Sequence, residues 1–330
     1  MEPGEKVLSD VHLYHTCECL STKESNSVTR FVIKLQSSDT DEIGDNAVSA
    51  DQDSVDNTGH REVITETQHI PSCLEVDEDG DLILQRDGNS FNSEDTAVIT
   101  LEHSLATELQ DVGEQVWAGA LLLCDFLLHH ETDFCQKSVL DLGAGTGLTT
   151  IVAAMLAKTV YCTDVGESVL RMAHHNVEIN ADLTSNCHVV VRELDWCKGL
   201  HVQGKGNFRL SEVDITDILQ AEVIIAADVI YDDDLTDALF KTIHLLLSKG
   251  PPKTVYMGLE KRLVFTLSDL DVVCPAYTHF YEGLVRLQQL GCEGRQFHYF
   301  RLDEDLPMYL NYNRTKQLEI WAIQSVIPNG

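Results

Sequence analysis

The sequence lacks the features of a secreted or membrane-spanning protein. Its first ten residues, MEPGEKVLSD, contain no basic stretch followed by an apolar run, and nowhere do about 18 apolar residues follow one another. The ten cysteines have no repeating spacing, and 330 residues bury enough surface to need no disulfide. His174 and His175 have no partners at metal-ligand spacing. We therefore expect reduced thiols, no metal centre and a soluble intracellular protein.

Basic residues are scarce. The chain has 23 Lys and Arg against 54 Asp and Glu, a formal net charge of −31, and residues 1–115 hold 26 acidic against 6 basic residues. Such a field repels phosphate backbones and attracts cationic surfaces, which disfavours direct nucleic-acid binding and favours a basic protein partner. The alternative is that the acidic residues only keep a disordered segment solvated. The pattern leaves the oligomeric state open, and a monomer is the simplest expectation.

The chain divides into three parts by composition. In residues 1–35, the segments Val7–His15 and Thr29–Leu35 alternate apolar and polar residues, which predicts two paired strands packed on a larger body. Residues 36–95 are acidic, polar and without hydrophobic periodicity, and we interpret them as mostly disordered. Residues 96–330 form the main domain.

In the main domain, apolar runs alternate with amphipathic helical stretches, as in an α/β protein. The predicted strands are Ser138–Leu142, Val160–Asp164, His188–Arg192, Val223–Asp228, Thr254–Leu259, Phe297–Leu302 and Leu318–Ile323. The predicted helices are Thr149–Leu156, Ser168–Asn180, Leu235–Leu247 and Ala276–Leu290. The last two strands are joined by a connection too short for a helical crossover, so they should be antiparallel. The fold class is therefore a Rossmann-like, seven-stranded, mostly parallel sheet with one antiparallel strand.

The segment VLDLGAGTGL at Val139–Leu148 is the most informative motif. A strand that ends near Asp141 enters a turn with Gly143, Gly145 and Gly147, and glycine there lets the backbone turn tightly and approach a nucleotide. The second strand ends 23 residues later at Asp164, which can accept hydrogen bonds from both ribose hydroxyls. Strand, glycine turn, helix and second acid together predict a nucleoside-cofactor site, whereas a glycine cluster alone would indicate only a steric turn.

The glycine spacing separates two kinds of cofactor. Dinucleotide sites use G-x-G-x-x-G, in which the second glycine admits the pyrophosphate. This chain has G-x-G-x-G with Asp141 two residues ahead of it. After the third strand, Asp195 could accept from an adenine amino group and Trp196 could cover the ring, or the pair could be a loop acid beside a core tryptophan.

Four segments resemble the family-16, seven-strand protein-lysine methyltransferases. They are VWAGA at Val116–Ala120, DLGAGTG at Asp141–Gly147, ELDW at Glu193–Trp196 and DVIY at Asp228–Tyr231. The last has the D-x-x-Y form of that family, and the N-P-P-Y signature of adenine and glutamine methyltransferases is absent. The family's usual proline in the tryptophan segment is replaced here by Ala118 or Gly119, which puts the local backbone in doubt.

The resemblance implies a class I methyltransferase fold and a protein-lysine N-methyltransferase that uses S-adenosylmethionine. It implies a nuclear and cytoplasmic enzyme acting on a nucleic-acid-associated protein. Asp228 and Tyr231 are then the candidate catalytic residues, which orient the amine. The candidate cofactor-binding residues are Trp117, Asp141, Gly143, Ala144, Gly145, Gly147, Asp164, Asp195, Trp196 and Ala227.

Several alternatives remain open. Asp228 could instead belong to a helix cap, although Asp233 or Asp234 suits that role better. Asp232, Asp233 and Asp234 could attract a basic peptide or be a solvated helix start, and Glu260–Arg262 could line the same rim. Tyr231 and Trp117 could offer ring faces to a cation. Other functions compatible with the motifs are a small-molecule methyltransferase, a cofactor-binding adaptor without turnover, and a nicotinamide enzyme.

Overall fold

A computed structural model describes residues 6–10, 17–18, 26–34, 96–266, 271–292 and 294–328. The predicted disordered segment, residues 36–95, lies outside the described residues, as do Leu35 and residues 11–15. Within the described part of the chain, no helix is long and apolar enough to cross a membrane.

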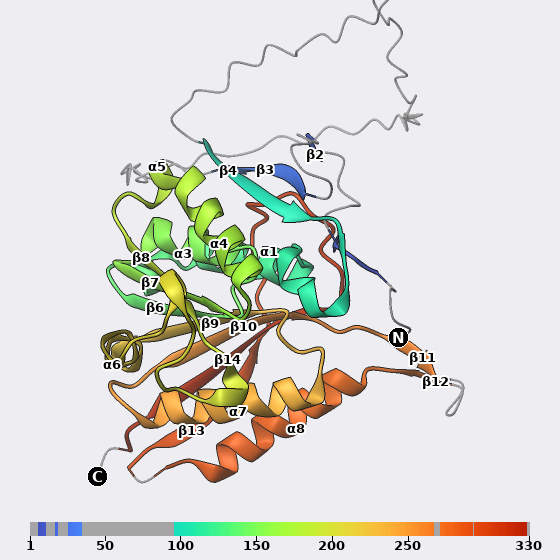
Figure 1. The fold of residues 1–330 in the computed structure, drawn as a ribbon. Coiled ribbons are helices and arrows are strands. Elements are labelled where there is room, and N and C mark those ends of the chain that lie inside the picture. The colour runs from blue at the N-terminus through green and yellow to red at the C-terminus, as the bar shows by residue number, and fades with distance from the viewer. Residues whose placement is uncertain are drawn as a thin grey trace, which may run out of the picture. The chain divides into compact units, whose positions relative to one another are not determined.

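The centre of the fold is a seven-stranded sheet (Figure 1). In spatial order its strands are β13 (Gln296–Leu302), β14 (Leu318–Val326), β10 (Thr254–Glu260), β9 (Val223–Ala227), β6 (Ser138–Leu142), β7 (Thr159–Asp164) and β8 (His188–Glu193). Strands β8, β7, β6, β9 and β10 are parallel, and β14 is antiparallel to both β10 and β13. The seven predicted strands and the antiparallel last pair are therefore confirmed, with ends that differ by at most three residues.

Helices cover both faces of this sheet. Figure 1 shows α1 (Ala118–His129), α3 (Leu148–Leu156) and α4 (Glu167–Ile179) on one face, and α7 (Asp233–Ser248) and α8 (Pro275–Leu290) on the other. Each face has its own apolar core, because β6 and its neighbours bury side chains on both sides. Four of these helices were predicted. Two helices were not predicted, α1 and α6 (Glu212–Gln220), and α6 packs into the same core as α7.

The pairing predicted for the N-terminal segments was wrong. β1 (Val7–Leu8) pairs with β5 (Ala106–Thr107), and β3 (Asn26–Lys34) pairs antiparallel with β4 (Thr96–Ser104) and with β2 (Cys17–Glu18). Alternation predicts that a segment is a strand but not which strand it joins. β5, the partner of β1, and β4, the longer partner of β3, both lie at the start of the main domain.

Side-chain amides fasten this small sheet to α4. Asn176 donates from Nδ2 to the carbonyl of Glu102 and accepts from its N–H, and Asn180 does the same with Thr100. The two side chains thus act as a partner strand for β4, satisfying backbone groups on its edge. A second bond from Asn176 Nδ2 reaches the carbonyl of Thr146, in the glycine turn.

The remaining elements are short. They are α2 (Glu131–Phe134), α5 (Ala181–Thr184), β11 (Val264–Thr266), β12 (Asp271–Val273), and the 3₁₀ turns Leu109–Glu114, Trp196–Lys198 and Gly206–Phe208. Because β6, β7, β8, β9 and β10 are parallel, the loops after them meet at one edge of the sheet, where ligands bind in such folds.

Candidate active site

The three predicted glycines form the turn between β6 and α3. Gly143, Gly145 and Gly147 all have positive φ, at 71°, 54° and 83°. A Cβ on Gly143 would lie 2.7 Å from Val229 Cγ1, and one on Gly145 would lie 2.8 Å from the carbonyl oxygen of Gly113. The N–H groups of Gly143 and Ala144 both donate to the carbonyl of Thr163, at 2.9 and 3.0 Å. Glycine is therefore required here by conformation and by space.

Asp141 lies beneath this turn and is fully buried. Its Oδ2 accepts hydrogen bonds from the hydroxyls of Thr149 and Thr150, both at 2.7 Å. Its Oδ1 is buried and has no hydrogen-bond partner among the described residues. Burial raises the pKa of Asp141 to about 7. A buried carboxylate oxygen without a donor can be stabilised by a ligand cation or N–H.

Asp164 ends β7 and is held from two sides. Its Oδ2 accepts from the N–H of Gly145 and its Oδ1 from the N–H of Val165, both at 2.7 Å. Burial raises the pKa of Asp164, and these two N–H groups oppose the rise. A carboxylate oxygen has a second lone pair, so both oxygens can still accept from ribose hydroxyls.

A 3₁₀ turn, Leu109–Glu114, lies against the glycine turn, as the contact between Gly113 and Gly145 requires. The indole Nε1 of Trp117 donates to the carbonyl of Val112 at 3.0 Å, which fixes the ring beside this turn. This turn was not predicted, because its six residues mix polar and apolar side chains without periodicity and give no sign that they border a binding site.

Trp196 lies over the glycine turn, and Asp195 stands at the start of the next short turn. Atoms Cη2 and Cζ2 of Trp196 lie 3.2 and 3.3 Å from a Cβ placed on Gly143, so the ring covers the glycine turn, and its buried Nε1 has no partner among the described residues. Asp195 accepts from the N–H of Cys197 at 3.0 Å and pairs with Lys198 Nζ at 2.9 Å. Its carboxylate therefore caps a short turn, and because these two partners use different oxygens, each oxygen keeps a lone pair that could accept from an adenine amino group.

Asp228 follows Ala227, the last residue of β9, with a φ of 51°. Its Oδ2 accepts from the N–H of Gly119 at 2.6 Å and its Oδ1 from the N–H of Glu260 at 2.9 Å. Burial raises its pKa, while the charge of Arg262 and these two N–H groups lower it. Asp228 thus joins the start of α1 to the end of β10, and leaves one lone pair on each oxygen for a substrate.

The helix cap ahead of α7 is Asp232, whose Oδ1 accepts from the N–H of Leu235 at 2.9 Å. The suggestion of Asp233 or Asp234 for that position was wrong by one or two residues. Asp228 does hold a helix N-terminus, but that of α1, a helix that was not predicted.

Two charged residues lie beside Asp228: Asp10, which the sequence did not indicate, and Arg262, which was expected only at the rim of the site. Asp10 Oδ2 accepts from the N–H of Ala118 at 2.9 Å, next to the bond between Asp228 and Gly119. Ser9 Oγ donates to the carbonyl of Val116 at 2.9 Å. The guanidinium of Arg262 lies 4.5 Å from the ring centroid of Trp117. The only sequence signal was that Ser9 and Asp10 stand inside a strand-like segment, where polar residues face solvent by default.

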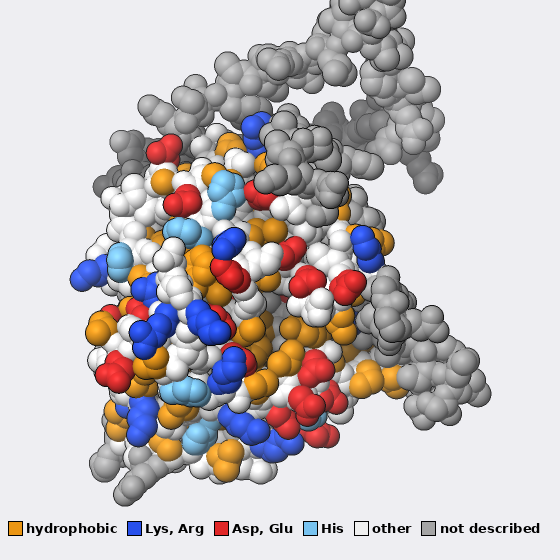
Figure 2. Space-filling model, in the orientation of Figure 1, with side chains coloured by type: hydrophobic (Ala, Val, Ile, Leu, Met, Phe, Trp, Pro, Cys, Tyr) orange, Lys and Arg blue, Asp and Glu red, His pale blue; other side chains and the backbone are white. Residues whose placement is uncertain are grey.

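Tyr231 lies at the edge of the site, 43% exposed. Burial of its hydroxyl, with the nearby charges of Asp164 and Asp232, raises its pKa to about 12, so the phenol keeps its proton. Asp233 and Asp234 follow and are exposed. Figure 2 shows hydrophobic side chains in the middle of this face of the molecule and a group of acidic side chains beside them.

Comparison with known proteins identifies the family. The family model described as lysine methyltransferase matches residues 94–271, which include the glycine turn, Asp195, Asp228 and Tyr231. The chain belongs to this lysine methyltransferase family. The resemblance read from the four sequence motifs is confirmed.

Individual matches agree with the family. Methyltransferase-like protein 22 of Mus musculus is 44% identical over 258 residues, 77% of this chain and 65% of that protein, so the chain spans less than two thirds of its length. Protein N-lysine methyltransferase METTL21A of Danio rerio is 34% identical over 137 residues, 42% of this chain and 56% of that protein. A solved magnesium protoporphyrin IX methyltransferase from Synechocystis with bound SAM has a TM-score of 0.37 and 14% identity, over 62% of this chain and 79% of that one.

The residues of the site fit S-adenosylmethionine, the cofactor of the lysine methyltransferase family. This ligand carries an ammonium group, two ribose hydroxyls and an adenine ring. Asp141 Oδ1 lacks a donor, and Trp196 Nε1 lacks an acceptor. Asp164 stands at the carboxyl end of β7, and the bare backbone of the glycine turn admits a close approach. The donor and acceptor atoms that this part of the chain leaves unused match those of the cofactor.

Proposed function

We propose that this chain is an S-adenosylmethionine-dependent protein-lysine N-methyltransferase. The observation that carries the proposal is a group of charges at the ends of β9 and β10. Burial raises the pKa of both Asp228 and Glu260, and the nearby charge of Asp10 raises both further. The guanidinium of Arg262 lies over the ring of Trp117 beside them. Three carboxylates beside an aromatic face suit a cationic side chain such as lysine.

The cofactor supplies an electrophilic methyl group on a sulfonium. Asp141, Asp164 and Trp196 would hold it against the glycine turn. Asp164 accepts a hydrogen bond from that turn, the ring of Trp196 covers it, and Asp141 Oδ1 has no partner among the described residues. The protein's work is then to position the lysine nitrogen and to exclude water, because no covalent enzyme intermediate is needed.

The lysine nitrogen must be uncharged to attack. The reference pKa of lysine is about 10.4, and desolvation lowers it. Asp228, with one free lone pair on each oxygen, would accept a hydrogen bond from the lysine amine. This bond would point the lone pair of the lysine nitrogen at the methyl group. The proton that leaves the lysine before attack goes to solvent or to this carboxylate, whose raised pKa makes it a better acceptor. Tyr231, protonated at neutral pH, would donate or accept at the edge of the site.

The substrate we propose is a protein with a basic, lysine-bearing surface. Exposed Asp232, Asp233 and Asp234 beside Tyr231, and the net charge of −31, would attract such a surface and repel nucleic acid. A nuclear and cytoplasmic location and a nucleic-acid-associated target remain predictions that rest on the resemblance of the motifs.

The test is transfer of labelled methyl from S-adenosylmethionine to proteins of a cell extract, with acid hydrolysis to identify methyl-lysine. The parent and Tyr231→Phe are compared, because the Tyr231 hydroxyl makes no hydrogen bond to another described residue and its removal should leave the fold intact. We expect labelled lysine with the parent, and at least about tenfold less with Tyr231→Phe.

Three results would contradict the proposal. Label confined to small molecules would indicate a metabolite methyltransferase. Cofactor binding without label would indicate an adaptor, and absence of cofactor binding would exclude the family's chemistry for this chain. Arg286→Ala on α8, an exposed residue, serves as the matched control and should label like the parent.

A further inference from the structure

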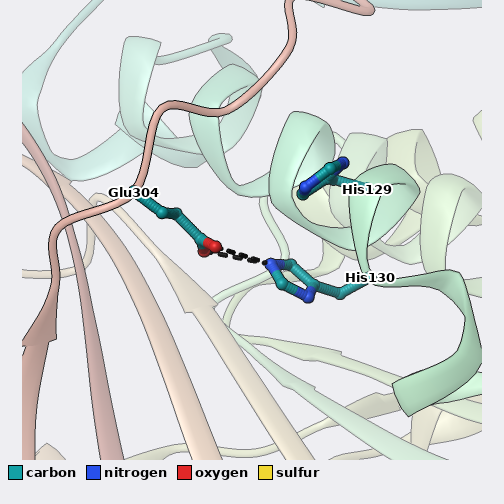
Figure 3. A group of neighbouring side chains, drawn as sticks. All are labelled: His129, His130 and Glu304. Carbon is teal, nitrogen blue, oxygen red and sulfur yellow. Dashed lines mark hydrogen bonds and ion pairs between the residues drawn. The ribbon is translucent and has the colours of Figure 1, made fainter.

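Two histidines and a glutamate meet on the side of the molecule where α1 ends. His129 is the last residue of α1, His130 follows it, and Glu304 lies in the connection after β13 (Figure 3). One ligand atom from each lies within 4.8 Å of the other two. His130 Nε2 lies 3.0 and 3.1 Å from the two oxygens of Glu304, across 174 residues of sequence.

The spacing suits a tetrahedral metal ion. Two ligand atoms at about 2.0–2.1 Å from zinc are about 3.3 Å apart at the tetrahedral angle. The separation of His130 from Glu304 already has this value within a few tenths of an ångström. His129 is exposed and makes no hydrogen bond or ion pair to another described residue, so a rotation of its side chain can close the remaining distance.

The surroundings of the cluster favour a cation. The other ring nitrogen of His130, Nδ1, lies 3.9 Å from Asp133 Oδ2, so a small movement would let this carboxylate accept from it, as an outer carboxylate does for many metal-bound histidines. The ring of Phe126 packs against His130 with centroids 4.5 Å apart, which restricts its movement. The carbonyl end of α1 also carries partial negative charge at this point.

We propose that His129, His130 and Glu304 form a binding site for a divalent transition-metal ion of the zinc type. Two imidazoles and one carboxylate are a zinc donor set that leaves a position for water. The bound ion fastens the end of α1 to the connection that follows β13. The same helix begins at Ala118, directly after Trp117, and Gly119 in its first turn contacts Asp228. The ion therefore steadies a helix that forms one wall of the candidate active site. Adjacent histidines carry little metal signal in a sequence whose third ligand is so far away.

The test is titration of the chelator-treated full chain with Co²⁺ and Zn²⁺, followed by absorption spectroscopy and calorimetry. We expect one equivalent of Co²⁺ with the visible bands of a four-coordinate ion, no thiolate charge-transfer band, displacement by Zn²⁺ and a rise in the thermal midpoint. His130→Ala and Glu304→Gln should each weaken Zn²⁺ binding by about tenfold or more.

The chain provides a matched control in His174 and His175, another adjacent pair on a helix surface, each near a single glutamate. The double variant His174→Ala/His175→Ala should bind Co²⁺ like the parent. The proposal is overturned if His130→Ala and Glu304→Gln bind as tightly as the parent, if the control loses as much affinity, or if the spectrum shows cysteine ligation. Circular dichroism of each variant identifies any loss that comes from unfolding.

Discussion

The carboxylate of Asp228 lies against the bare backbone of Gly119 and accepts a hydrogen bond from its N–H at 2.6 Å. A Cβ on Gly119 would lie 2.6 Å from Asp228 Oδ2, closer than any side chain tolerates. The loop after β9 and the start of α1 therefore meet only because residue 119 has no side chain. The family's proline, absent from this segment, would have no N–H for Asp228 at that position.

Gly119→Ala should impair methyl transfer without impairing cofactor binding. The added methyl displaces the Asp228 carboxylate, and overpacking of this kind costs about 1–3 kcal/mol of stability. Methyl transfer should fall at least about tenfold, while S-adenosylmethionine still binds, because Gly119 is not part of the glycine turn. The comparison is Gly143→Ala, where φ is 71° and Val229 is 2.7 Å from the new Cβ, and where cofactor binding itself should be lost. Calorimetric titration with the cofactor distinguishes the two variants. Equal cofactor affinities in Gly119→Ala and Gly143→Ala would contradict the assignment of Gly119 to the substrate side and Gly143 to the cofactor side.

The raised pKa of Asp141 should make the stability of the cofactor-free protein fall between pH 5 and 8. Its pKa is about 7 when folded and about 3.9 in an unfolded chain, so the folded state holds the proton more tightly. Its contribution to the free energy of unfolding is fully present below about pH 4 and is lost as pH rises to about 7. Asp141→Asn removes this dependence. Between pH 5 and 8 the stability of the variant should rise relative to the parent by on the order of 2–3 kcal/mol.

Urea denaturation of both proteins at several pH values measures this difference. The same variant should bind S-adenosylmethionine more weakly, because the negative oxygen without a donor is gone. A gap between the two proteins that stays constant from pH 5 to 8 would show that Asp141 keeps its charge in the free protein.

Arg262→Ala should uncover the face of Trp117. A cation over an exposed aromatic ring contributes about 0.5–1 kcal/mol, so removal of the competing guanidinium should lower KM for a lysine peptide roughly two- to fivefold. Loss of this positive charge also raises the pKa of Asp228, which moves the acidic limb of the kcat profile to higher pH. Steady-state kinetics from pH 6 to 9 measure both effects. A higher KM would instead show that Arg262 helps to bind the substrate.

The sequence predicted the parts of the fold that are local. β6, β7 and β10 are short apolar runs bounded by turns, and the glycine turn is marked by three residues within five positions. α1 was missed because it is buried on nearly all sides and lacks the amphipathic pattern of α7 or α8.

Contacts between distant segments could not be predicted. Asp10 reaches Ala118 over 108 residues, and Glu304 reaches His130 over 174. The role of Asp228 was expected from a motif, but its two backbone partners depend on how α1 and β10 end beside β9. Such pairings depend on the tertiary fold, which periodicity in one segment does not encode.

Asn176 and Asn180 offer a last comparison, because both fasten β4 to α4 and only one reaches the cofactor side. Asn176 Nδ2 also donates to the carbonyl of Thr146 at 2.8 Å, whereas the second bond of Asn180 Nδ2 goes to the carbonyl of Asn176 at 2.7 Å. Alanine at either position leaves half-buried backbone groups of β4 without partners, and each such group costs up to about 1–3 kcal/mol. Both variants should therefore lose stability by similar amounts in thermal denaturation.

The two variants should differ in their affinity for the cofactor. In Asn176→Ala the carbonyl of Thr146 loses its donor and the glycine turn loses its tie to β4, so S-adenosylmethionine should bind about tenfold more weakly, or roughly 1.4 kcal/mol. In Asn180→Ala the turn keeps that bond, and affinity should stay within about twofold of the parent. Equal losses in both variants would mean that β4 acts on the site through overall stability alone. A loss confined to Asn176→Ala would show that the strand added before the main sheet helps to hold the turn against which the cofactor binds.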